Sequence, residues 1–163
     1  MKRLTATLCL TIAVLLGSVG VSASADIQKG LTSYDRGDYA TALREWTPLA
    51  EQGDAFAQLL LGAMYANGDG VSQDYKIAVK WYRLSAEQGE DNAMFTLSLS
   101  YEDGKGVKQD LVYAHMWRSI AAMNGNLAAS MQMDILEEKM TQGRVIIAQD
   151  LARECVRKKY KGC

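Results

Sequence analysis

The residues of this chain that could bind an ion or a phosphate lie in a glycine-containing segment. The segment occurs twice, as YANGDGVSQDYKIAVKWY (residues 65–82) and, 36 positions later, as YEDGKGVKQDLVYAHMWR (residues 101–118). Asn67 and Asp69 resemble the start of a calcium-binding loop, which also requires a carboxylate at its twelfth position. The chain has Ala78 and Ala114 there. The pattern therefore argues against calcium, and the lack of a following Gly-Lys-Ser/Thr sequence argues against a phosphate loop.

Catalytic chemistry has few candidate residues in this chain. His115 is the single histidine, so hydrolysis by a serine or cysteine nucleophile would have to use it as the base. It aligns with Val79 of the preceding copy, and we expect a packing histidine rather than a catalytic one. Glu137 and Glu138 are adjacent on an expected helix and point in different directions. The sequence thus indicates no catalytic residue, no metal site and no cofactor.

Two cysteines near the C-terminus, Cys155 and Cys163, are candidates for a disulfide bond. On one straight helix their Cα atoms would be about 12 Å apart, which is too far for a disulfide. A bond between them requires the helix to end in between, and Gly162 supplies a flexible turn. In an exported chain the pair predicts a disulfide, with free thiols or an intermolecular bond as the alternatives.

The first 25 residues have the pattern of a secretory signal peptide. Lys2 and Arg3 precede an apolar run over residues 4–16, and an A-x-A sequence ends at Ala25. We expect cleavage after Ala25, which leaves residues 26–163 as one repeat domain that is periplasmic or secreted. An uncleaved membrane anchor is the alternative. After cleavage we expect no stable membrane insertion.

The charge of the mature chain is unevenly distributed. Without Lys2 and Arg3, the mature chain has 16 of the 18 basic residues and all 19 acidic ones. Five basic residues stand against the single Glu154 at the C-terminal end, namely Arg153, Arg157, Lys158, Lys159 and Lys161. An acidic body with a short basic tail gives no electrostatic case for nucleic acid. We interpret the tail as a solvated helix end, with contact to an anionic lipid or polymer as the alternative.

The 36-residue period covers most of the mature chain. It predicts four units, at approximately residues 27–53, 54–89, 90–125 and 126–159. Each unit reads as two helices, because apolar residues recur at helical spacing on both sides of the joint. In the last unit we expect one helix over residues 126–139 and a final helix from about Gln142, with Thr141 as its N-cap. Gly68 and Gly70 are expected to end the first helix and Asp74 to cap the second. The fold class is therefore all-α, an α/α superhelical solenoid of about eight helices in antiparallel pairs.

The segment AQLLLGAMYANGDGVSQDYKIAVKWYRLSAEQG resembles the Sel-one-like repeat family, which is related to the tetratricopeptide repeat. The resemblance is carried by Ala57, Leu61, Gly62, Tyr65, Gly68, Gly70, Val71, Asp74, Ala78, Trp81, Tyr82, Ala86 and Gly89. In the second copy Ser98 and Arg118 replace Gly62 and Tyr82, and we expect looser helix packing at Ser98. The resemblance implies a right-handed superhelix without catalytic residues that binds other proteins at the bacterial envelope, in signalling or in host contact.

A second face of each unit's first helix is a candidate surface for a partner. It consists of Phe56, Leu59 and Ala63, then Asn92, Phe95 and Leu99, then Ala128, Met131 and Ile135. On the concave side this row would dock a helix or an extended peptide, whereas burial in the core is the alternative. We therefore expect an exported non-catalytic scaffold for an unidentified protein or peptide. The alternatives are a cell-wall enzyme with β-lactamase or peptidoglycan-type activity, a peptidoglycan-binding module, and an inhibitor of a membrane sensor.

Overall fold

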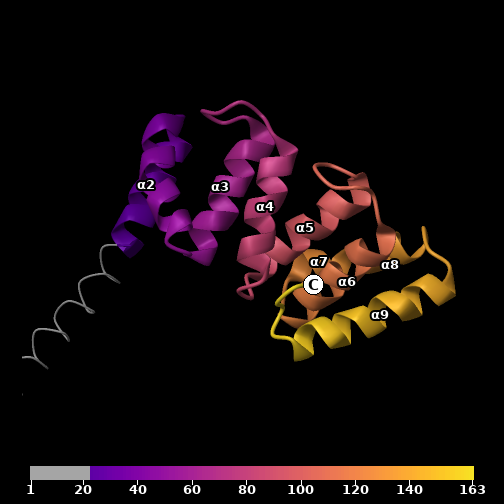
Figure 1. Cartoon of the computed structure of the whole chain (residues 1–163). Coiled ribbons are helices and arrows are strands. Elements are labelled where there is room, and N and C mark those ends of the chain that lie inside the picture. Colours follow the sequence, from indigo (N-terminus) through magenta and orange to yellow (C-terminus); the bar gives the residue numbers. More distant parts are fainter. Residues whose placement is uncertain (1–22) are drawn as a thin grey trace, which may run out of the picture.

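The computed structural model describes residues 23–163, and all regular secondary structure in this range is α-helix. The helices are residues 23–35, α2 (Tyr39–Glu51), α3 (Ala55–Asn67), α4 (Tyr75–Ala86), α5 (Asp91–Asp103), α6 (Leu111–Met123), α7 (Leu127–Met131), α8 (Met133–Glu137) and α9 (Gln142–Arg157). Consecutive helices pack on one another along the array (Figure 1). The expected all-α solenoid is confirmed.

The described residues begin three positions before the expected signal-peptide cleavage site, which follows Ala25. Residues 23–35 form one helix, and Ala25 lies within it. Most of the expected signal peptide, residues 1–22, lies outside the described part of the chain. No described helix is long and apolar enough to cross a membrane. Cleavage after Ala25 therefore stays a prediction.

The joint between paired helices is built in the same way in both central units. Gly68 follows α3 in the left-handed conformation, with φ 82°, and the Asp74 carboxylate accepts two N–H groups in the first turn of α4. Gly104 and Asp110 repeat this arrangement between α5 and α6. The expected roles of these glycines and aspartates as helix caps are confirmed.

The second glycine of each joint is required by contact with the preceding unit. Gly106 has φ 76°, and a Cβ there would lie 2.1 Å from the backbone oxygen of Tyr75 at the start of α4. Gly70 is related in the same way to Tyr39 at the start of α2, where a Cβ would lie 2.7 Å from that of the tyrosine. The joint of one unit therefore rests on the second helix of the unit before it.

A large side chain on the second helix of a unit packs over a small residue on the first helix. Trp46, Tyr82 and Arg118, each 36 positions after the last, occupy this place in three successive units, and all are buried. A Cβ on Gly30 would lie 2.1 Å from the Trp46 ring, and one on Gly62 would lie 2.6 Å from the Tyr82 ring. The helices of these two pairs can approach closely because the facing residue has no side chain.

The first helix of the C-terminal unit differs from the expected one. The sequence predicts a single helix over residues 126–139, but the structure has two short helices, α7 and α8, separated at Gln132. The Gln132 carbonyl accepts from Arg118 Nη1 at 3.1 Å and from the Leu136 N–H at 3.4 Å. The Arg118 side chain, from α6, thus shares the Gln132 carbonyl with a backbone N–H of the helix at the point where the helix breaks.

The last helix and the tail follow the expected course. α9 begins at Gln142, although the Thr141 side chain makes no capping hydrogen bond. It packs against α6 with buried Val145, Ala148, Ala152 and Cys155. After α9 ends, the chain turns back and the Cys155–Cys163 disulfide closes with a Cα–Cα distance of 5.7 Å. Both the disulfide and a helix end between its cysteines are confirmed.

Candidate protein-binding surface

The residues of the expected apolar row lie on α3, α5, α7 and α8, and only some of them face solvent. Phe56, Met131 and Ile135 are exposed, by 38%, 80% and 56%. Asn92 and Ala128 are exposed as well. The half-buried members are Leu59, Ala63, Phe95 and Leu99. The row therefore does not form one continuous exposed surface.

The middle of the row belongs largely to the core. Leu59 and Phe95 pack against the main hydrophobic cluster. The Arg118 guanidinium also lies over the Phe95 ring, 5.8 Å from its centroid. Leu99 borders a cavity of about 180 Å³ between α3, α4 and α5 that Tyr82 also lines. For these residues the alternative of burial describes the structure better than a free docking surface.

The exposed part of the row is extended by a residue that the sequence analysis missed. Leu127 at the start of α7 is 77% exposed, and with Met131 and Ile135 it forms a series at positions i, i+4 and i+8. We call these three residues the α7–α8 stripe. The helical spacing from Met131 back to Leu127 was a usable signal, but Leu127 has no counterpart in the aligned triplets.

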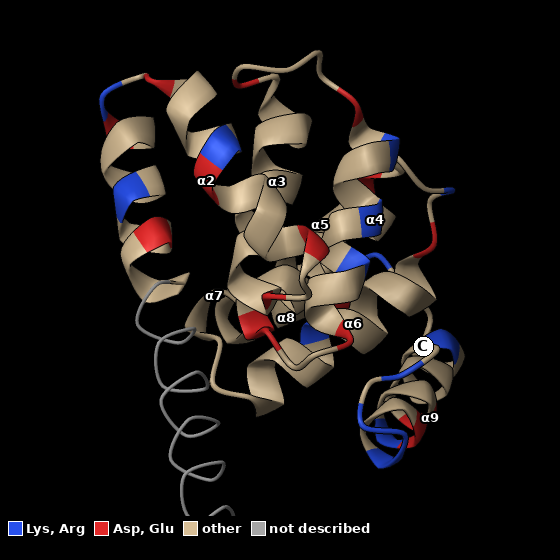
Figure 2. Ribbon diagram, turned by 60° about the vertical axis from the view of Figure 1, so that its left-hand side comes forward, with Lys and Arg blue, Asp and Glu red and all other residues tan. Residues whose placement is uncertain are grey.

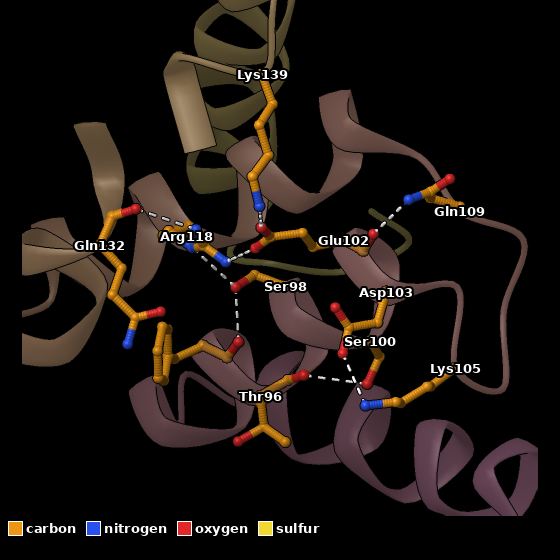
Figure 3. Close-up of polar contacts among 11 residues, drawn as sticks. Thr96, Ser98, Ser100, Glu102, Asp103, Lys105, Gln109, Arg118, Gln132 and Lys139 are labelled. Carbon is orange, nitrogen blue, oxygen red and sulfur yellow. Dashed lines mark hydrogen bonds and ion pairs between the residues drawn. The ribbon is translucent and has the colours of Figure 1, made fainter. Parts of the chain in front are cut away.

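Beneath α7 and α8 lies a network centred on the buried Arg118 (Figure 3). Arg118 donates through Nε to Ser98 Oγ at 3.3 Å and through Nη1 to the Gln132 carbonyl at 3.1 Å. Its Nη2 pairs with Glu102, whose other oxygen accepts from Lys139 Nζ at 2.6 Å. The network joins α5 and α6 to the break between α7 and α8.

This network corrects the expected looser packing at Ser98. Ser98 is completely buried, and its hydroxyl donates to the Phe95 carbonyl at 2.7 Å while accepting from Arg118. Burial opposes ionisation of Glu102, but hydrogen bonds from Lys139 and Arg118 outweigh it and hold the pKa of this carboxyl below its usual value. The pair formed by Ser98 and Arg118 is therefore packed as closely as the pair formed by Gly62 and Tyr82. Polar contacts take the place of the tyrosine ring.

His115 connects α6 to α8. The ring is buried, with Nε2 2.8 Å from Glu137 Oε1 and Nδ1 3.1 Å from Ser119 Oγ. Ser119 lies one turn further along α6 itself. Because both ring nitrogens have partners, this is the arrangement expected of a packing histidine.

The oxygen ligands considered for calcium are used inside the protein. Asp69 accepts from the Tyr34 hydroxyl at 2.6 Å and from Asn67 Nδ2 at 3.0 Å. The bond to Asp69 is the main reason that the pKa of Tyr34 is raised. No group of three or more His, Cys, Asp or Glu in residues 23–163 is placed to hold a metal ion. Asp69 thus links the first unit to the second.

The repeated joints and the stacked helix pairs define a helical-repeat protein. The Sel1 repeat family matches residues 55–90 and 91–126, which are the α3–α4 and α5–α6 units. The chain therefore contains two Sel1 repeats, and the resemblance carried by its sequence is confirmed. Proteins of this kind are generally repeat scaffolds that mediate protein interactions.

Two solved structures support this assignment. One is a protective antigen present in uropathogenic Escherichia coli strains that displays an SLR fold, with 27% identity, a TM-score of 0.79 and coverage of 85% of this chain. The other is a Sel1 repeat protein from Oxalobacter formigenes, with 32% identity, a TM-score of 0.66 and coverage of 78%. This chain spans 31% and 54% of their lengths. No curated protein sequence matches it.

Proposed function

We propose that this protein is an exported, non-catalytic scaffold that binds a protein partner through the α7–α8 stripe. The observation that carries the proposal is the exposure of Leu127, Met131 and Ile135 at helical spacing. Exposed apolar side chains in such a series are typical of a site that receives an amphipathic helix or an extended peptide. Phe56 on α3 is a further exposed member of the row.

The stripe is held on its inner side by polar contacts. Arg118 bonds the backbone at Gln132, and His115 bonds Glu137 on α8. The apolar residues that these short helices give to the core are Ala129 and Leu136, which are fully buried. The exposed residues of the stripe are therefore not needed to attach α7 and α8, and a partner can use them on a fixed support.

The test is site-specific crosslinking. A photoreactive amino acid at position 131 should give one discrete adduct in cells, and the double variant Leu127→Glu/Ile135→Glu should abolish it. The matched control is Leu84→Glu, since Leu84 is 46% exposed on α4 and lies outside the stripe. An adduct that survives the double variant, or one that Leu84→Glu removes equally, would reject the stripe as the binding site.

Export is the second part of the proposal. It is supported by the pattern of residues 1–25 and by the Cys155–Cys163 disulfide, which oxidising compartments favour. The similarity to a protective antigen is consistent with a periplasmic or secreted location. Mass spectrometry of the protein purified from its native cell should find an N-terminus at Asp26. A cytoplasmic protein that retains residues 1–25 would contradict export.

A further inference from the structure

The last helix exposes apolar side chains that its packing on α6 does not use. Ile146, Ile147 and Val156 on α9 are 50%, 53% and 40% exposed, and Met123 at the end of α6 is 61% exposed. A surface groove of about 680 Å³ runs beside α9 and is lined by Met123 and Ile147 among others. Ile146 is not part of its lining. The apolar exposure therefore extends beyond the groove.

This apolar surface lies in a strongly basic segment of an acidic protein. Residues 142–163 carry six basic and two acidic side chains, whereas residues 23–141 carry 10 basic and 17 acidic ones. Figure 2 shows basic residues gathered on the C-terminal part of α9 and on the tail. The molecule thus has opposite net charges in its body and at its C-terminal end.

The basic charge of this segment is only partly neutralised within the described chain. Its two carboxylates are paired, Asp150 with Arg153 and Glu154 with Lys158. The three remaining cations near the C-terminus, for which residues 23–163 supply no ion pair, are Arg157, Lys159 and Lys161. All three are exposed. They are available for an anionic partner.

We propose that the outward surface of α9 docks peripherally on an anionic phospholipid membrane. Ile146 and Ile147, which lie on the side of α9 away from its buried residues, would enter the interface, and the three unpaired cations would lie at the headgroups. An exposed helix that combines large apolar residues with a cluster of Lys and Arg is typical of such binding. Repulsion of the acidic body from the same surface would orient the molecule with α9 against the membrane.

The extent of the apolar surface favours a membrane over an acidic peptide. A peptide lying in the groove would cover Met123 and Ile147 but leave Ile146 in water, because Ile146 lies outside the groove. A planar membrane surface would cover both Ile147, which lines the groove, and Ile146, which lies outside it. The proposal is independent of the α7–α8 stripe.

The experiment is cosedimentation with vesicles, using the protein as it is delivered by export and with its N-terminus identified by mass spectrometry. We expect binding to phosphatidylglycerol/phosphatidylcholine vesicles at 0.1 M salt, little binding to pure phosphatidylcholine, and loss at 0.5 M salt. The triple variant Arg157→Gln/Lys159→Gln/Lys161→Gln should weaken partitioning by about fivefold for each cation removed. Ile146→Gln/Ile147→Gln should weaken it at both salt concentrations.

The matched control has the same change in net charge at a different place. Lys76, Lys80 and Lys108 are exposed and make no ion pair within the described residues. Replacing all three by Gln should leave vesicle binding nearly unchanged. Equal loss in both triple variants would overturn the proposal, as would equal binding to neutral vesicles. Binding of a Glu-rich apolar peptide by a protein that ignores anionic vesicles would assign the surface to a protein partner instead.

Discussion

Position 118 shows how one place in a repeat can be filled by different chemistry. In the two preceding units an aromatic ring, Trp46 or Tyr82, packs over a glycine. In the third, a buried arginine faces Ser98 and pairs with Glu102. The sequence alone identified the substitution but could not supply its consequence, because Glu102 and the Gln132 carbonyl reach Arg118 only in the folded chain.

Arg118→Met should destabilise the protein by about 3 kcal/mol, because the half-buried Glu102 keeps only Lys139 as a charged partner and the Gln132 carbonyl loses a donor. The double variant Ser98→Gly/Arg118→Tyr recreates the pair formed by Gly62 and Tyr82, and should recover part of this loss. Urea unfolding measures both. If the double variant is no more stable than the single one, the volume of the side chain is not what matters at this position.

Glu102 should also make stability sensitive to acid. Its pKa in the folded protein is lowered from the ordinary value of 4.5. A carboxyl of this kind stabilises the fold above its unfolded pKa, and the contribution is lost as pH falls through the folded pKa. Unfolding free energy should therefore fall below about pH 4.5 more steeply in the wild type than in Glu102→Gln. Parallel pH profiles would contradict this role for Glu102.

At the scale of the elements, the joints were predictable and the break between α7 and α8 was not. Gly68 and Asp74 have local roles that residue type alone indicates, because a left-handed cap favours glycine and a free helix end favours aspartate. The break at Gln132 coincides with a hydrogen bond from Arg118, 14 positions earlier in the sequence. A contact of this kind leaves no signal in the helical periodicity, and the periodicity of residues 126–139 therefore predicts a single helix.

The middle of the expected apolar row is half-buried for a related reason. Phe95 and Met131 occupy equivalent positions, yet Phe95 packs against the core and Met131 is exposed. Helical spacing places both on the same face of their helices, but it does not say whether a neighbouring element covers that face. That is set by packing between units, and the short α7 and α8 leave their outer side open.

The second glycine of the joint offers a direct test of packing between units. Gly106→Ala should destabilise the protein by well over 2 kcal/mol, since it adds a backbone clash to the roughly 1–2 kcal/mol of left-handed strain. Gly37→Ala is a matched control, because Gly37 also has φ 76° but its Cβ would meet nothing within 4 Å. It should show the strain alone in urea unfolding. Equal losses would mean that Gly106 is needed only for its conformation.

At the scale of the whole molecule, the 36-residue period predicted the architecture because each unit repeats the same local contacts. The period does not predict the surfaces that could bind a partner, because these depend on which side chains remain exposed after the units pack together. The α7–α8 stripe and the outward side of α9 both lie toward its C-terminal end. The repeated residues build the scaffold, and the unmatched ones, such as Leu127 and Ile146, carry the candidate interactions.

The disulfide should hold this C-terminal end together. It closes a loop with a sequence separation of 8, and loop entropy gives it about 2–3 kcal/mol. Tyr160 within the loop contacts Asn124 at the end of α6 through its hydroxyl at 3.3 Å. Cys155→Ser/Cys163→Ser should therefore lower the unfolding free energy by that amount and raise hydrogen exchange in the last turns of α9 more than in α3. Thiol labelling of the exported wild-type protein without reductant should detect no free thiol at either position, and two labelled cysteines would refute the bond.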